Sequence, residues 1–322
     1  AVLCTTVESV AALFAVRLLM GVAQAAWDLS RKTWLASEVP KAMRGRIAAT
    51  MAGVMKITIM IAAVLGGFLA EHVGARSVFL LQASLSAVAL LVLALHFYLA
   101  RQQQAQGDSR QVRPVAPNLA AGRVGLASVL RLHWRSLSGA GVYCALLSGC
   151  RNTWMIALPL TAHSIGLSKV GIGLTVAAGR AIEACVTLLA AGQIMDKYGR
   201  KAAGLPANIM MAGAFGLLAL TKASGFLTLV LAVMLWGVAN GLCGGIIVSF
   251  ATDLTPESCR SEFLGLWKTV QAVGGLVLPP FFGVVSDFSG SLEVASTAMC
   301  FCALLTALWL LLFVSSPTAQ ST

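Results

Sequence analysis

The apolar residues of this chain fall in long blocks separated by short polar segments, and they follow neither the two-residue nor the 3.6-residue period of a half-buried strand or helix. A bilayer core about 30 Å thick needs about 20 mostly apolar residues per helix. Blocks of this length are too long for the strands of a membrane barrel, in which apolar and polar residues also alternate. The pattern predicts an all-α polytopic membrane protein with nine spans, over residues 8–29, 48–70, 77–99, 139–163, 169–191, 204–222, 225–250, 264–286 and 294–315.

The composition supports a protein that lies in the membrane. Hydrophobic residues make up 58% of the chain and charged residues 11%, whereas a soluble domain carries about 25% charged residues. We therefore expect an integral, multi-pass membrane protein that is in contact with the lipid bilayer.

The net charge of +11 raises the question of a nucleic-acid partner, and its distribution answers that question. The gaps between the expected spans alternate between the two sides of the membrane. Most Lys and Arg residues lie in the gaps on one side, above all in residues 30–47 and 100–138, while the gaps on the other side contain only Arg76, Lys169 and Lys222. This asymmetry is the positive-inside signature, so the basic gaps face the cytoplasm. Basic charge sets the topology here, and no nucleic-acid partner is expected.

An internal repeat relates the two ends of the chain. Residues 17–74 align without a gap with residues 233–290, and identities fall at corresponding places in a helix, a cytoplasmic loop and an outer helix end. The aligned identities include Gly21 with Gly237, Pro40 with Pro256, Arg44 with Arg260, and Gly74 with Gly290. Parallel six-helix repeats joined by a long central loop are the architecture of major facilitator transporters.

Local motifs make this resemblance more specific. The segment Gly192-Gln-Ile-Met-Asp196-Lys-Tyr-Gly199-Arg200-Lys201 resembles the signature loop G-x-x-x-D-x-x-G-R-K of the major facilitator superfamily. Arg17 and Gly21 resemble the R-x-x-x-G of its fourth helix, and the P-x-x-x-R spacing of Pro40 and Pro256 is similar to two of its cytoplasmic loops. The resemblance implies the major facilitator fold, two six-helix halves, with the nine spans standing for family helices four to twelve.

This assignment sets the expected domains. Residues 1–100 would be the remainder of the N-terminal half with three spans, residues 101–138 a cytoplasmic central linker, and residues 139–322 a C-terminal six-helix half. The first three family helices would then be missing from the chain, which is N-terminally truncated in this interpretation; a natural nine-span protein is the alternative. Residues 123–135 of the linker interleave apolar and basic residues, which suits either an amphipathic helix on the inner leaflet or an irregular segment.

Two helical stripes are candidates for the substrate path. Arg17, Gly21 and Gln24 share one face of the first span, and Asn240 occupies the matching stripe of the second half, one turn after Trp236. The resemblance implies that Arg17, Gln24 and Asn240 face the central cavity, and Trp236 is a further substrate-binding candidate. The alternative is that Gly21 and Gly237 permit close helix packing and that Arg17 has a structural role.

Buried charges supply the other substrate-binding candidates, because ionisable residues inside a membrane persist only where they face protein or water. These candidates are Lys56, Arg151 with its neighbours Asn152 and Trp154, and the pair Arg180 and Glu183. The spacing of three residues allows Arg180 and Glu183 to pair along a helix, either as a fixed ion pair or as a proton-coupling site. The excess of bases over Glu183 favours an anionic substrate, with Arg151 as the main contact.

The signature loop carries the gating candidates. Two glycines allow a tight turn, and Arg200 can reach a carboxylate on the same side of the membrane, for which Asp253 or Glu257 is the natural partner. The gating residues that we expect are Gly192, Asp196, Gly199, Arg200, Lys201, Asp253 and Arg260.

The function predicted is secondary active transport of a small organic anion by alternating access. Whether protons are the coupling ion stays open. A proton-driven exporter of neutral or cationic compounds is one alternative, and a non-transporting receptor or scaffold is another. The sequence contains no HExxH, GxSxG or Walker lysine motif, so we expect no enzyme, no cofactor and no metal. A monomer that binds a small-molecule substrate is expected.

Overall fold

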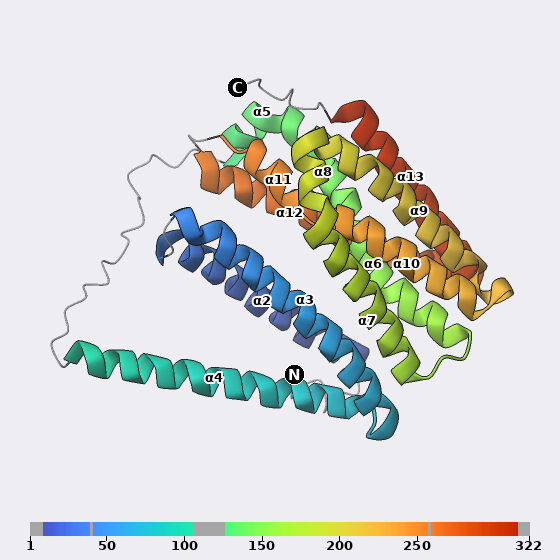
Figure 1. The fold of residues 1–322 in the computed structure, drawn as a ribbon, viewed down its shortest axis with the longest axis horizontal. Coiled ribbons are helices and arrows are strands. Elements are labelled where there is room, and N and C mark those ends of the chain that lie inside the picture. Colours follow the sequence, from blue (N-terminus) through green and yellow to red (C-terminus); the bar gives the residue numbers. More distant parts are fainter. Residues whose placement is uncertain (1–8, 39–40, 106–125, 257–258, 315–322) are drawn as a thin grey trace. The chain divides into compact units, whose positions relative to one another are not determined.

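The chain is helical throughout the part that the structure describes. The computed structural model describes residues 9–38, 41–105, 126–256 and 259–314, and these ranges contain helices and turns but no strand (Figure 1). The predicted all-α class is confirmed.

Seven helices are long and apolar enough to cross a membrane, counted over the described residues. They coincide with seven of the nine expected spans and run over Val54–His72, Ala75–Leu99, Lys169–Met195, Arg200–Ser224, Phe226–Ala251, Glu262–Ser289 and Leu292–Phe313. Each has 19 or more residues, which at 1.5 Å per residue matches the thickness of the hydrocarbon core.

The other two expected spans are helical but do not reach this threshold. The block at 139–163 corresponds to α6 (Val142–Ser164), whose Arg151 and Asn152 lower its mean hydropathy and lie outside the buried stripe of the helix. The block at 8–29 lies in α2 (Val10–Glu38), where only Phe14–Gln24 forms a shorter apolar stretch.

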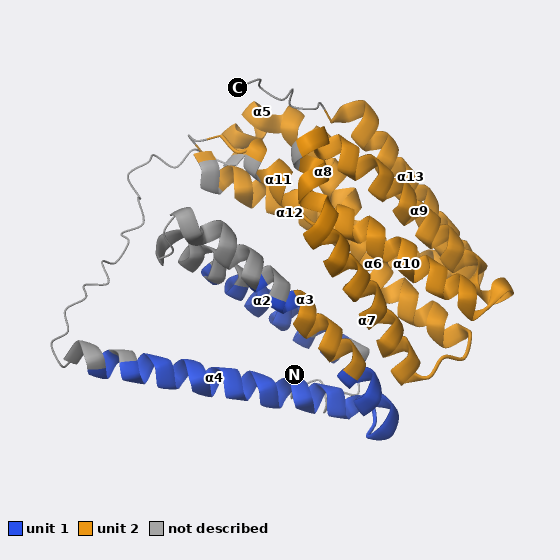
Figure 2. Cartoon of the chain, viewed as in Figure 1, with its two compact units in different colours: residues 1–55, 65–121 blue, residues 56–64, 122–322 orange. Residues whose placement is uncertain are grey.

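The chain divides into two compact units, Ala1–Met55 with Leu65–Ala121, and Lys56–Val64 with Gly122–Thr322 (Figure 2). The first unit contains α2, most of α3 (Lys41–His72) and α4 (Ala75–Ala105). The turn between α3 and α4 contains Gly74, whose φ of 109° requires glycine. Its repeat equivalent Gly290 also has a positive φ, 64°, where α12 ends, so a glycine with positive φ follows the helix in both copies.

The second unit is built from six helical rods. They are η1 with α6 (Leu137–Gly141, Val142–Ser164), α7 with η2 and α8 (Lys169–Val186, Thr187–Ala191, Gly192–Tyr198), α9 (Arg200–Ser224), α10 with α11 (Phe226–Leu242, Ile246–Asp253), α12 (Arg260–Ser289) and α13 (Leu292–Phe313). Helix α6 packs mainly on α12 and α13, while α10 packs on α7 and α9. Both η segments are π-helical turns: η1 precedes α6, and η2 lies between α7 and α8.

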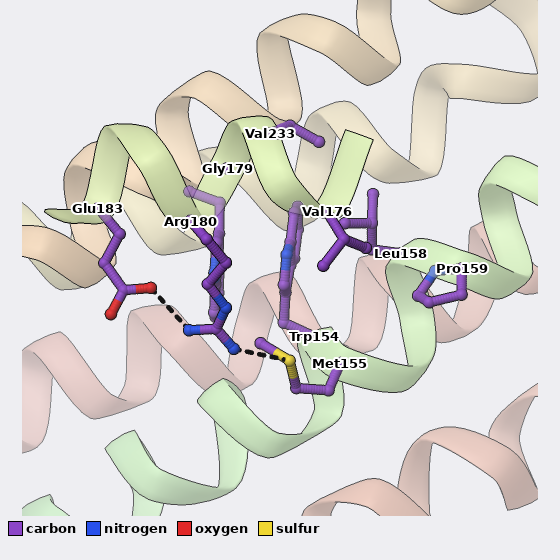
Figure 3. A pocket seen from close by; sticks show the side chains of 10 residues that line it. Trp154, Met155, Leu158, Pro159, Val176, Gly179, Arg180, Glu183 and Val233 are labelled. Carbon is purple, nitrogen blue, oxygen red and sulfur yellow. Dashed lines mark hydrogen bonds and ion pairs between the residues drawn. The ribbon is translucent and has the colours of Figure 1, made fainter. Parts of the chain in front are cut away.

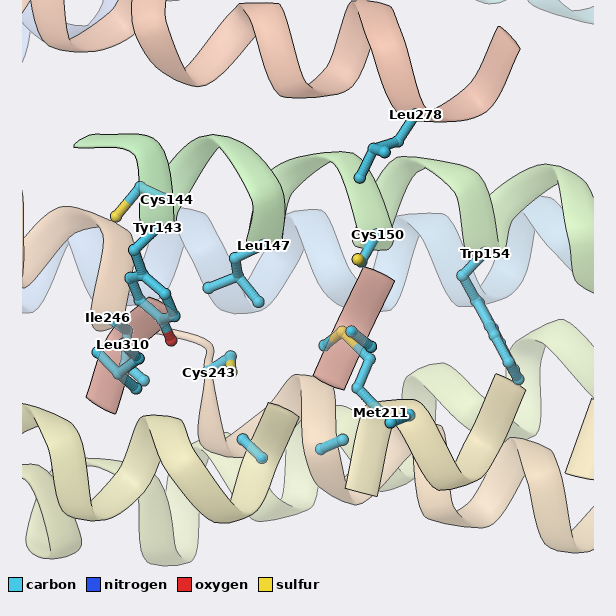
Figure 4. Packing of buried hydrophobic residues seen from close by; sticks show 14 of the residues in the cluster. Tyr143, Cys144, Leu147, Cys150, Trp154, Met211, Cys243, Ile246, Leu278 and Leu310 are labelled. Carbon is cyan, nitrogen blue, oxygen red and sulfur yellow. The ribbon is translucent and has the colours of Figure 1, made fainter. Parts of the chain in front are cut away.

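The core of this unit follows one stripe of α6. Tyr143, Leu147, Cys150 and Trp154 recur at three- and four-residue intervals and are at most 2% exposed (Figure 4). This stripe meets buried side chains of the surrounding helices, including Met211, Cys243, Ile246, Leu278 and Leu310. The buried thiols among these residues behave as small apolar side chains.

Helix α6 lies very close to α12 because both carry glycines at the contact. A β-carbon added to Gly274 would lie 1.8 Å from the carbonyl oxygen of Ala145, and one added to Gly149 would lie 2.6 Å from the carbonyl oxygen of Gly274. Neither position tolerates a side chain without separating the helices, as is usual for small-residue packing in membranes.

A short helix precedes the six rods. Helix α5 (Leu126–Ser136) covers most of the linker segment for which the sequence left a helix and an irregular segment open, so the helix is confirmed there. The earlier linker residues, 106–125, lie outside the described residues.

Candidate substrate cavity and cytoplasmic ion pair

A cavity of about 180 Å³ opens between α6, α7 and α10 of the second unit (Figure 3). Pockets for drug-sized ligands measure about 300–1,000 Å³, so this cavity suits a smaller solute. Its wall is formed by Trp154, Met155, Leu158, Pro159, Val176, Gly179, Arg180, Glu183, Val233 and Trp236. The only charged residues in this wall are Arg180 and Glu183, which makes the site apolar with one polar end.

The polar end is organised around the Glu183 carboxylate. The Arg180 guanidinium Nη1 donates to Glu183 Oε2 at 2.7 Å, and Lys56 Nζ lies 3.7 Å from Glu183 Oε1. The Glu183 side chain is 4% exposed, and those of Arg180 and Lys56 are 18% and 25% exposed. Two bases therefore share one buried acid, and the group carries a net positive charge.

Thr187 joins this group, although nothing in the sequence analysis singled it out. Its hydroxyl accepts from Lys56 Nζ at 2.9 Å and donates toward the carbonyls of Glu183, at 2.7 Å, and Gly241, at 3.2 Å. The available signal was spacing, because Arg180, Glu183 and Thr187 recur at three- and four-residue intervals on one face of the helix.

Arg151 lies near this group without being neutralised by it. Its charge acts on both Glu183 and Lys56, yet within the described ranges its half-buried side chain makes no hydrogen bond and no ion pair. Arg151 is not part of the cavity wall. Among the described residues, the three bases Lys56, Arg151 and Arg180 thus act on one acid, Glu183.

The other end of the cavity is aromatic. The Trp154 and Trp236 rings stack with centroids 4.3 Å apart and planes 3° apart, and Phe215 packs edge-on against both. Such stacking is favourable beyond the burial of area. Both tryptophans were predicted as substrate-binding residues, and the structure brings them together in the cavity wall, whereas the supporting Phe215 had no signal in the sequence.

Glycines fix the distance between α7 and α10 beside the cavity. A β-carbon on Gly237 would lie 2.9 Å from the Gly179 carbonyl oxygen, and one on Gly241 would lie 2.7 Å from Val186 Cβ. The sequence left open whether Gly237 faces the cavity or permits close helix packing, and for this residue the structure supports helix packing. Val233, on the same stripe, does line the cavity.

The remaining substrate candidates lie elsewhere. The Asn152 amide nitrogen lies against Gly275 of α12, since a β-carbon there would approach it to 2.4 Å. Asn240 is 1% exposed and outside the cavity wall, and its side-chain amide oxygen Oδ1 has no hydrogen-bond partner in the described part of the chain. Gln24 is exposed in the first unit, and the Arg17 side chain lies outside the described residues. For these residues substrate contact stays a prediction.

A second ion pair lies at the far end of the same unit, where the signature loop meets α11. Arg200 Nε donates to Asp253 Oδ2 at 3.1 Å, with the side chains 24% and 33% exposed. The contact that the sequence suggested between these two residues is present, and its part in gating stays a prediction.

The rest of the signature loop shapes this end. Gly199 joins α8 to α9 at a φ of 84°, which requires glycine, whereas no neighbour within 4 Å would restrict a β-carbon on Gly192. Lys201 Nζ donates to the Leu311 carbonyl at 3.3 Å near the end of α13, a favourable place for a cation. The side chains of Asp196 and Arg260 lie outside the described residues.

Comparison with known proteins gives the family. The sequence model of the Major Facilitator Superfamily matches residues 1–153 and 142–322, which together span the chain. A search of curated proteins found no significant match. The family match agrees with the membrane-length helices and with the signature loop that shaped the resemblance. The chain therefore belongs to the major facilitator superfamily of membrane transporters and is an integral, multi-pass membrane protein.

Proposed function

We propose that the protein is a secondary active transporter of a small organic anion, bound in the cavity between α6, α7 and α10. The observation that carries this proposal is the charge imbalance around Glu183. Lys56 and Arg180 already share its carboxylate, and Arg151 has no partner among the described side chains. An uncompensated base inside a membrane protein is unfavourable, and an anionic solute would neutralise it.

In this proposal Arg151, which lies outside the cavity wall in the structure, turns toward the polar end of the cavity and becomes the principal ligand for the anion. A guanidinium offers several donors in a planar fork and binds carboxylate or phosphate oxygens with two parallel hydrogen bonds. Lys56 and Arg180 would contribute charge while remaining on Glu183. The apolar remainder of the solute would lie along Trp154 and Trp236, because the rest of the cavity wall provides almost no polar groups.

Alternating access would be controlled at the cytoplasmic end. The Arg200–Asp253 pair joins the start of α9 to the end of α11, and we propose that it holds these helices together when the inner gate is closed. Proton coupling through Glu183 belongs to the same proposal, although the two bases on its carboxylate are equally suited to a fixed ion pair. Following the internal pH of proteoliposomes during transport would distinguish the two roles.

The test uses the purified protein and a panel of small anionic, neutral and cationic solutes. Ligand binding raises the melting temperature, so the panel first identifies binders, whose uptake is then measured in proteoliposomes. We expect anions to bind. Arg151→Ala should weaken their binding about tenfold or more, since hydrogen bonds to charged groups contribute about 1.5–3 kcal/mol. Arg151→Lys, which keeps the charge but loses the fork, should have an intermediate effect.

Lys222→Ala is the matched control. It removes a base from the exposed C-terminal end of α9, away from the cavity, and should leave binding unchanged. If only cations bind, and Arg151→Ala binds them normally, the anionic assignment is wrong. The exporter of neutral or cationic compounds would then be the better description.

A further inference from the structure

Helix α5 exposes large apolar side chains on its outer surface. Leu130, Leu132 and Trp134 are 47%, 76% and 55% exposed, whereas Val129 is 1% exposed. Val129 and the His133 ring, which packs edge-on against Phe263, fix the opposite side of the helix to the bundle. The apolar residues left outside are therefore not needed to hold α5 in place.

Two arginines accompany these apolar residues. Arg131 and Arg135 are both exposed and lie on either side of His133, where the helix is kinked. In the ranges that the structure describes, neither forms an ion pair, and the sequence of α5 contains no Asp or Glu. The Arg135 guanidinium lies 5.9 Å from the Trp134 ring centroid. Arg135 lines a small cavity together with Asp253, but that carboxylate is already paired with Arg200, so the two arginines of α5 remain available to an external anion.

The position of α5 places its outer surface at the membrane boundary. After a kink at His133, the chain continues through η1 into α6 without a loop, and α6 is one of the rods of the second unit (Figure 1). The positive-inside asymmetry predicts that this end is cytoplasmic. The inner leaflet carries anionic lipids and a negative surface potential.

We propose that α5 is a binding site for anionic phospholipid headgroups. Arg131 and Arg135 hold the phosphate groups, and Trp134 with the exposed leucines enters the boundary between headgroups and acyl chains. A lipid fits better than a soluble acidic partner, because tryptophan and leucine beside arginine is the pattern of helices that lie in the interface. The site is distinct from the cavity between α6, α7 and α10 and independent of the transported solute.

The test follows Trp134 in the full chain reconstituted in nanodiscs. Bromines on lipid acyl chains quench nearby tryptophans, and the difference between the parent and Trp134→Phe isolates the signal of Trp134. We expect brominated phosphatidylglycerol to quench this signal more than brominated phosphatidylcholine at equal mole fraction. Arg131→Gln/Arg135→Gln should reduce that preference about fivefold per arginine.

Lys169→Gln/Lys222→Gln is the control, because it removes the same charge from the other end of the unit and should leave the preference unchanged. Equal quenching by the two lipids in the parent would overturn the proposal. It would also be overturned if neither lipid quenches Trp134 while aqueous iodide does, since α5 would then face the cytosol.

Discussion

Two of the ion-pair groups in the second unit have the same chemistry but different surroundings. Glu183, with Arg180 and Lys56, lies inside the bundle with its side chain 4% exposed, whereas Asp253, with Arg200, lies at the end of α11 with its side chain 33% exposed. The shortest contacts are similar, 2.7 Å and 3.1 Å. These distances do not distinguish the two pairs, but the exposed fractions of their acidic side chains do.

Burial decides what each pair contributes. Removing one partner of a buried pair leaves an uncompensated charge in a medium that solvates it poorly, at a cost of about 3–5 kcal/mol. An exposed pair is solvated and screened, and contributes about 0–1 kcal/mol. The inner group should therefore control stability as well as transport, whereas the outer pair should affect transport much more than stability.

The largest effect is expected at Glu183. Glu183→Gln removes the only acid of the inner group and leaves Lys56, Arg151 and Arg180 to repel one another. We expect a loss of about 3 kcal/mol or more in stability, seen as a large fall in melting temperature in detergent, and loss of uptake in proteoliposomes.

The matched variant for this prediction is Arg180→Gln/Glu183→Gln, which restores the net charge of the native group. It should recover much of the melting temperature without recovering transport. If Glu183→Gln melts like the parent, the three bases are neutralised by groups other than Glu183, and the charge imbalance no longer supports an anionic solute.

A smaller and more selective effect is expected at the outer pair. Asp253→Asn should change stability by about 1 kcal/mol or less, while uptake should fall severalfold if closing the gate requires the pair. Melting temperature and the initial rate of uptake, measured on the same preparation, separate the two quantities.

The exchanged pair Arg200→Asp/Asp253→Arg tests whether the contact itself matters. It should recover part of the uptake lost in Asp253→Asn, because the opposite charges again meet across α9 and α11. Unchanged uptake in Asp253→Asn would remove the pair from the gating mechanism and leave the signature loop with a structural role.

The two regions also differ in how far the sequence predicts them. Arg180 and Glu183 are three residues apart on one helix, and the Arg200–Asp253 contact followed from opposite charges in loops on one side of the membrane. The Lys56 contact with Glu183 joins segments far apart in the chain, so no local spacing indicates it. Burial, which sets the energetic difference, depends on the neighbouring helices.

The sequence also does not predict the contacts of residues that suit two different arrangements of the helices. Gly237 suits either a cavity wall or a close helix contact, and only the position of Gly179 on α7 decides for the contact. Trp154 and Trp236 were both identified as candidates, but their stacking depends on how α6 and α10 pack. Arg151 and Asn152 keep the hydropathy of α6 below that of the seven membrane-length helices, although the bundle buries one of its faces.

The smallest effect is expected at a third ion pair, which extends the comparison to a more exposed site. Lys222 Nζ lies 3.3 Å from Glu293 Oε1, with side chains 68% and 31% exposed. Glu293 also lies in the first turn of α13, where the helix dipole favours an acid without any help from Lys222. Lys222→Gln should therefore shift the melting temperature very little and leave uptake unchanged.

A double-mutant cycle with Glu293→Gln should give a coupling energy of about 0.5 kcal/mol or less, decreasing with added salt. A coupling comparable to that of Glu183 with Arg180 would show that exposure in the isolated chain does not report how strongly a charge is solvated at the membrane surface, and the ranking of the three pairs by burial would fail.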